Sequence, residues 1–135
     1  MRFFRYKIFT ILWALVIMVL TFTPGPNLPP LPHWELISFD TFVHTVIFGV
    51  LIFLLANTLK RLDSDSFLSK YQLLVALLLA FAYGVLIEVI QPYIPGRTFD
   101  YYDILSNTIG CFIGLIVLWI QTAFSRSFLT RSPGK

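Results

Sequence analysis

Long, continuous runs of apolar residues separated by short polar segments dominate this chain. There are four such runs, at about residues 8–23, 41–59, 71–91 and 102–121. About 20 apolar residues in a helix cross a hydrocarbon core roughly 30 Å thick. Helices are the default spanning structure, because backbone groups inside a bilayer have no water to bind, and the runs are too long for membrane strands. The pattern predicts an all-α, four-helix transmembrane bundle.

The composition supports a membrane protein. The chain is 57% hydrophobic and 13% charged, against roughly 45–50% and about 25% in soluble domains. A chain with so little polar surface cannot cover itself in water, so the lipid bilayer is its expected partner. We expect one domain over residues 1–125, followed by a short basic tail over residues 126–135.

The first apolar run also has features of a secretory signal peptide, because Arg2, Arg5 and Lys7 precede it. However, residues 21–24 read Thr-Phe-Thr-Pro and contain no small-residue cleavage triplet. We therefore predict that the run is retained as the first span. A cleaved signal would leave three spans instead.

The positions of lysine and arginine predict the orientation. Nine of the ten would lie on one side of a four-span chain, and only Arg97 on the other. The nine are Arg2, Arg5, Lys7, Lys60, Arg61, Lys70, Arg126, Arg131 and Lys135. Since basic residues are retained on the cytoplasmic side, both termini are expected in the cytoplasm. The net charge of +3 then reflects topology, and without a clustered basic face we expect no nucleic-acid partner.

Polar residues within the spans gather at one predicted depth. They lie where the second helix begins, the third ends and the fourth begins, which places all of them at the outer leaflet. The seven are Asp40, His44, Glu88, Gln91, Arg97, Asp103 and Asn107. Charged side chains at membrane depth are costly and normally face the bundle interior or a cavity. We therefore predict a polar, ligand-binding cluster on the outer side.

Several members also have a structural interpretation. Asp40 and Asp103 can stabilise the first turns of their helices. His44 can bridge two helices through its two ring nitrogens. Arg97 can be an exposed turn residue, a partner of Glu88, or a planar fork that binds a carboxylate or phosphate.

Small residues follow the polar positions along the predicted helices. Gly84 lies one turn below Glu88, and Gly110 and Gly114 form a G-x-x-x-G step below Asn107. Glycines at this spacing allow helices to pack closely in membranes. We expect these three glycines to mediate helix packing, and the lone cysteine, Cys111, to be a packing residue.

Three spaced motifs resemble those of a known family. They are Asp40-x-x-x-His44, then Tyr83-Gly84-x-x-Ile87-Glu88-x-x-Gln91, then Arg97-x-x-Asp100-x-x-Asp103-Ile104-x-x-Asn107-x-x-Gly110-x-x-x-Gly114. Together they resemble the VanZ-like family of small bacterial membrane proteins, named after a factor that confers teicoplanin resistance. The resemblance implies a multi-pass protein of the bacterial cytoplasmic membrane that is linked to glycopeptide resistance. Where the family pattern has Asp-Lys before the histidine, this chain has Asp40-Thr41.

Three functions follow from these observations. The leading hypothesis is an outer-leaflet pocket that binds an envelope lipid headgroup or glycan, with Arg97 holding an anionic group. The second is a membrane-embedded hydrolase or transferase acting on a lipid-linked envelope precursor, with His44 or Glu88 as acid or base. The third is a structural or assembly role in which the cluster fixes helix packing.

The enzymatic hypothesis is the weaker of the first two. The chain contains no G-x-S-x-G or H-E-x-x-H motif, and Ser106 has no evident base in the sequence. Asp40, His44, Glu88 and Asp103 are acceptable metal ligands by type, yet the sequence alone favours neither a metal nor another cofactor. The ligand and the oligomeric state stay open.

Overall fold

The computed structural model describes residues 2–27, 39–62 and 66–130. Within these residues the chain forms helices and no strand. The helices are α1 (Arg2–Phe22), α2 (Phe39–Leu59), α3 (Phe67–Lys70), α4 (Gln72–Ile90) and α5 (Tyr101–Thr130), with single 3₁₀ turns at Gly25–Asn27 and Gln91–Tyr93. The predicted all-α architecture is confirmed.

Four of the helices are long and apolar enough to cross a membrane. The qualifying segments are Arg5–Phe22, Phe39–Leu59, Gln72–Tyr93 and Tyr101–Phe124. Large apolar side chains such as Leu78 and Ile116 are exposed on the outside of the bundle, as expected for a surface that faces lipid. The structure therefore agrees with the four predicted spans.

Helical structure extends beyond the four predicted apolar runs. The last helix was expected over residues 102–121, yet α5 continues to Thr130. The sequence gives it no reason to stop, because no glycine or proline occurs between Gly114 and Pro133. The short polar segment between the second and third apolar runs contains α3, where the Ser66 hydroxyl accepts a hydrogen bond from the Ser69 N–H (3.1 Å). A helix this short has no apolar repeat from which to predict it.

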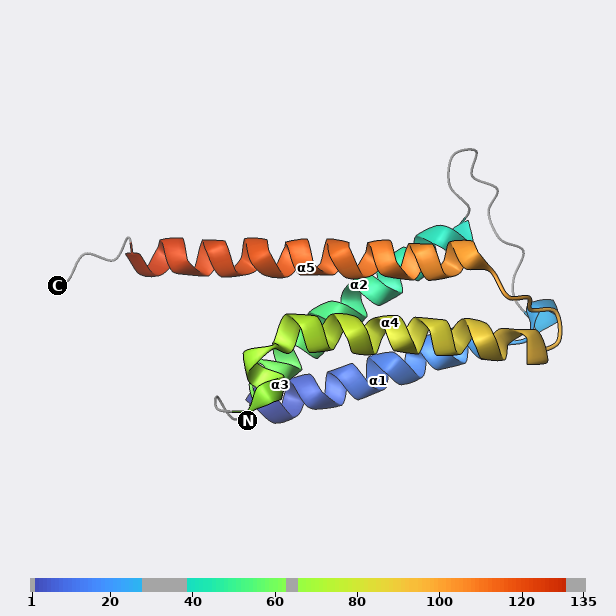
Figure 1. Cartoon of the computed structure of the whole chain (residues 1–135), viewed down its shortest axis with the longest axis horizontal. Helices are drawn as coiled ribbons and strands as arrows, with labels where there is room; N and C mark the ends of the chain where they lie inside the picture. The colour runs from blue at the N-terminus through green and yellow to red at the C-terminus, as the bar shows by residue number, and fades with distance from the viewer. Residues whose placement is uncertain (1, 28–38, 63–65, 131–135) are drawn as a thin grey trace.

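The arrangement of the helices brings the predicted polar positions to one end of the bundle (Figure 1). Helix α2 runs obliquely and packs against α1, α4 and α5. The beginnings of α2 and α5 and the end of α4 lie together, and we call this the polar end. The beginning of α1 and the end of α5 lie at the opposite, basic end, where α2 leads into Lys60 and Arg61. All three polar segments therefore share one depth, as their sequence order predicted.

Glycines allow the closest helix approach, between α2 and α5. A Cβ atom on Gly110 would collide with the backbone of Thr45, and one on Gly114 with the Gly49 carbonyl and the Ile52 side chain. A Cβ on Gly84 of α4 would lie 3.1 Å from the Asn107 amide nitrogen. These contacts place the α2 and α5 backbones close enough for short polar side chains to meet across the interface.

Helix α1 is joined to the bundle by side-chain hydrogen bonds. The Trp13 indole N–H donates to the Ile47 carbonyl of α2 (2.9 Å), and the Tyr83 hydroxyl of α4 donates to the Ala14 carbonyl (2.7 Å). Such bonds between membrane helices contribute on average about 0.6 kcal/mol each. They fix the rotation of α1, a helix whose apolar sequence carries little directional information.

Candidate functional site

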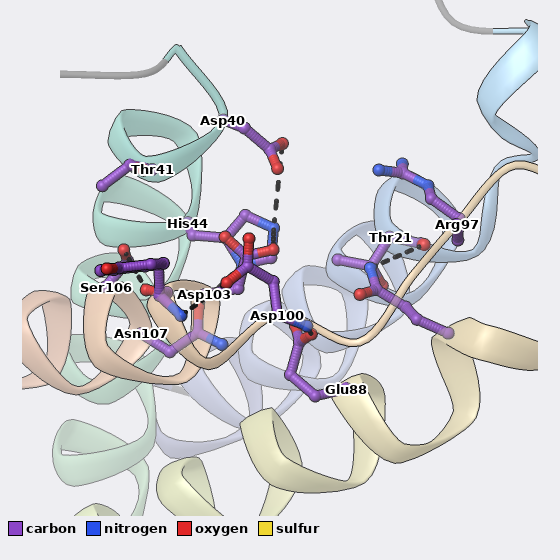
Figure 2. Close-up of polar contacts among 12 residues, drawn as sticks. Thr21, Asp40, Thr41, His44, Glu88, Arg97, Asp100, Asp103, Ser106 and Asn107 are labelled. Carbon is purple, nitrogen blue, oxygen red and sulfur yellow. Dashed lines mark hydrogen bonds and ion pairs between the residues drawn. The ribbon is translucent and has the colours of Figure 1, made fainter.

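Five of the seven predicted polar residues converge at the polar end, and we call them the acid–histidine site (Figure 2). They come from three helices: Asp40 and His44 from α2, Glu88 from α4, and Asp103 and Asn107 from α5. The side chains of His44, Glu88, Asp103 and Asn107 are buried, whereas that of Asp40 is 41% exposed. Asp40 is therefore the member through which the site meets the outside of the bundle.

The imidazole of His44 is oriented by an amide. Its Nδ1 lies 3.0 Å from Oδ1 of Asn107. Because an amide oxygen only accepts hydrogen bonds, this contact assigns the hydrogen to Nδ1. In the neutral ring the other nitrogen, Nε2, then presents a lone pair.

That second nitrogen faces two carboxylates. Nε2 lies 3.7 Å from Oδ2 of Asp103 and 4.0 Å from Oδ1 of Asp40. Both distances exceed a hydrogen bond. Three groups that all carry lone pairs repel one another, so the arrangement calls for a positive charge between or on them.

Glu88 brings a fourth acceptor from α4. Its Oε2 accepts a hydrogen bond from the Asp100 backbone N–H (3.3 Å). Its Oε1 is buried and has no hydrogen-bond partner in the described part of the chain, and neither has the Asn107 amide nitrogen. A buried polar atom without a partner carries the full cost of losing its hydration. Such an atom indicates that the site accepts a further polar group.

Gln91 and Arg97 lie apart from the other five, against the end of α1. Gln91 is 2% exposed, and its amide nitrogen donates to the Thr21 carbonyl (3.2 Å). Arg97 donates through Nε to the Thr23 carbonyl and through Nη2 to the Leu20 carbonyl, both at 3.1 Å. The last carbonyls of a helix lack partners within the helix and carry partial negative charge. Both residues therefore cap α1, and the described contacts of Arg97 include no acid.

Asp100 takes the capping role that the sequence offered to Asp103. Its Oδ1 accepts a hydrogen bond from the Tyr102 N–H (2.7 Å) at the start of α5. The Asp103 carboxylate is thereby free to face His44. Sequence reasoning had not assigned a role to Asp100, although an aspartate directly before an apolar helix is a recognised capping signal.

Ser106 does not present a free nucleophile. It is buried, and its hydroxyl donates to the Tyr102 carbonyl of its own helix (2.6 Å). A serine that bonds the preceding turn in this way has its proton engaged. The contact adds no support to a serine-dependent reaction.

Two cavities lie away from the acid–histidine site. One of about 500 Å³ opens at the basic end among α2, α4 and α5, where Asn57, Lys60 and Trp119 contribute to its lining. The other, of about 480 Å³, is an apolar groove along α2 and α5 lined by residues such as Phe53 and Val117. None of the seven predicted site residues lines either cavity. The acid–histidine site is therefore separate from both of these cavities.

Comparisons with curated proteins and with solved structures give no match. A family model described as VanZ/LLP1 matches residues 9–122. The match covers most of the chain and contains all five residues of the acid–histidine site as well as Gln91 and Arg97. The chain belongs to the VanZ/LLP1 family.

Proposed function

We propose that this chain is a multi-pass protein of the bacterial cytoplasmic membrane that binds a polar envelope ligand, a lipid headgroup or glycan, at its acid–histidine site. The observation that carries the proposal is the convergence of polar side chains from three helices, with Oε1 of Glu88 left without a hydrogen-bond partner among the described residues. Burying carboxylates at the end of a membrane bundle is costly. Such groups in a pocket or cluster are typical of functional sites.

The charges of the site define what it binds. Asp40, Glu88 and Asp103 supply negative charge, and the only basic side chain among the five site residues is His44. Arg97 is bonded to the carbonyls of α1, so we propose it as a positioning residue in place of the anion anchor expected from sequence. The contacting part of the ligand then carries a positive charge or several hydrogen-bond donors.

Binding can be tested on the full chain in lipid nanodiscs. The probes are phosphatidylethanolamine, a lipid-linked glycan precursor and teicoplanin, each added separately and followed by native mass spectrometry. We expect at least one probe to bind, and Glu88→Gln to weaken it by about tenfold or more, the effect of losing one charged contact. Lys60→Gln, at the basic end, is the matched control and should bind as the unmodified chain does. Equal binding by Glu88→Gln would refute the proposal.

The proposal includes an orientation, with the polar end outside and both termini in the cytoplasm. It rests on the lysine and arginine distribution. The test is labelling of single cysteines by a membrane-impermeant thiol reagent in intact cells, in a Cys111→Ala background. Tyr93 at the polar end is 85% exposed and Phe67 near the basic end is 67% exposed. We expect the reagent to label Tyr93→Cys and not Phe67→Cys. Labelling of Phe67→Cys alone would show the opposite orientation.

Family membership supports the envelope as the place of action and extends the proposal to teicoplanin resistance. Expression in a susceptible bacterium should then raise the teicoplanin concentration needed to stop growth. The Glu88→Gln variant, expressed to the same level, should not. Equal resistance in the strains that express the unmodified chain and the Glu88→Gln variant would show that resistance does not depend on the acid–histidine site.

A further inference from the structure

We propose that Asp40, His44 and Asp103 hold a divalent metal ion, Zn²⁺ or Mn²⁺. This inference rests on the proposed function, because it identifies the positive charge that the acid–histidine site requires. The sequence did not favour a metal, since residues 40, 44 and 103 lie on two helices and only the fold brings them together. A carboxylate–histidine–carboxylate set is suited to both ions, because each accepts oxygen and imidazole ligands.

The geometry is that of a slightly open coordination site. One potential ligand atom from each of the three residues lies within 4.8 Å of the other two. The Nε2 of His44 is 3.7 Å from Asp103 and 4.0 Å from Asp40. Ligands bound to Zn²⁺ at about 2.0–2.2 Å are roughly 3.3 Å apart in a tetrahedron. The side chain of Asp40 is 41% exposed, so it has room to rotate toward the other two ligand atoms.

The surroundings of His44 match those of a metal-binding histidine. Such a histidine donates the hydrogen of its other ring nitrogen to an oxygen acceptor, which fixes both the tautomer and the ring orientation. Here Nδ1 is 3.0 Å from Oδ1 of Asn107, so Nε2 is left to bind the metal. The same contact explains why a buried amide accompanies the two acids.

Charge balance favours a divalent ion. Two carboxylates and a neutral imidazole carry two negative charges, which a divalent cation offsets. A protonated His44 would supply one positive charge, and at 3.7 and 4.0 Å it would make no hydrogen bond to either acid.

A separate observation also points to a ligand. Glu88 is fully buried, its Oε1 has no hydrogen-bond partner in residues 2–27, 39–62 and 66–130, and its side chain rises from α4 toward Asp100 and Asp103 (Figure 2). A carboxylate in this position can accept a hydrogen bond from water bound to the metal. Three protein ligands also leave coordination positions open, as in metal sites that bind substrates. A hydroxyl group of the envelope ligand, which is also a hydrogen-bond donor, can occupy such a position near Asp40.

The inference is tested with the metal alone. Purified full-length protein is stripped of metal, dialysed against Zn²⁺ or Mn²⁺ and analysed for bound metal, and Co²⁺ absorption reports the ligand geometry. We expect about one equivalent per chain, and a loss of affinity of about tenfold or more in His44→Gln and Asp103→Asn. Asp100→Asn is the matched control: it removes a nearby acid, keeps a helix-capping side chain and should bind metal unchanged.

Less than about a tenth of an equivalent in the unmodified chain, or full affinity in a folded His44→Gln variant, would overturn the inference. If a buried variant does not fold, the half-exposed Asp40→Asn variant supplies the same comparison, with helix content measured by circular dichroism. A chelator separates the two proposals. Binding of an envelope probe by a protein that takes up no metal refutes the metal site and keeps the proposed function, whereas metal binding without any bound probe supports the metal site and refutes the proposed function.

Discussion

The Oδ1 of Asn107 lies 3.0 Å from Nδ1 of His44 and so joins α5 to α2 through the ring that faces two acids. The contact connects the packing of the bundle with the chemistry of the site. Close approach of the two helices at Gly110 and Thr45 makes it possible. Asn107 is therefore expected to matter both for stability and for the orientation of the imidazole.

Replacing Asn107 with alanine should lower the free energy of unfolding by about 1–3 kcal/mol, because a buried ring nitrogen loses its partner. Thermal unfolding in detergent measures the effect. Thr108→Ala is the control, since its hydroxyl donates a hydrogen bond to the Ile104 carbonyl of its own helix. Equal stability of the two variants would show that the bond between His44 and Asn107 contributes nothing.

Arg97 distinguishes the structural role seen here from the anion-binding role expected from sequence. Arg97→Ala removes two hydrogen bonds to the end of α1 and should destabilise the protein by about 1–3 kcal/mol. Ligand and metal affinity in the folded fraction should stay the same, and Arg97→Lys should recover part of the stability. Normal stability with lost binding would instead establish Arg97 as the anion anchor.

Gly110→Ala tests the closest contact between α2 and α5. In an isolated helix this change is favourable by about 1 kcal/mol. Here the added methyl group would collide with the Thr45 backbone, and overpacking typically costs about 1–3 kcal/mol. A net loss of stability is therefore expected, while Ile116→Ala, at a position 56% exposed on the same helix, should have a much smaller effect. A stabilised Gly110→Ala variant would contradict the packing at this interface.

The four spans could be predicted because their signal is local: each run is apolar over the length of a membrane helix. The common depth of Asp40, Glu88 and Asp103 followed from the order of the spans. The division of roles could not be predicted in this way. Arg97 contacts α1, and Asp100 caps α5 so that the Asp103 carboxylate can face His44. Both depend on how the helices are rotated against one another. Apolar sequences encode this rotation only through packing.

Glu88→Gln distinguishes a functional site from a purely structural one. In the structural hypothesis the carboxylate holds α4 in place, so its replacement should reduce folding yield and function together. However, within the described part of the chain Oε1 of Glu88 is buried without a hydrogen-bond partner, while Oε2 accepts a hydrogen bond from the Asp100 N–H at 3.3 Å. A glutamine keeps that acceptor and removes a buried charge, so we expect stability equal to or greater than that of the unmodified chain.

Ligand binding by the same variant should weaken by about tenfold or more, because the ligand loses a charged contact. The two readouts are the thermal unfolding midpoint in detergent and the binding of envelope probes in nanodiscs. Gln91→Ala is the comparison, since it breaks a structural bond to Thr21 and should lower stability while the folded fraction still binds. If Glu88→Gln instead lowers stability and binding in parallel, the prediction is wrong. The carboxylate of Glu88 would then have a structural role alone.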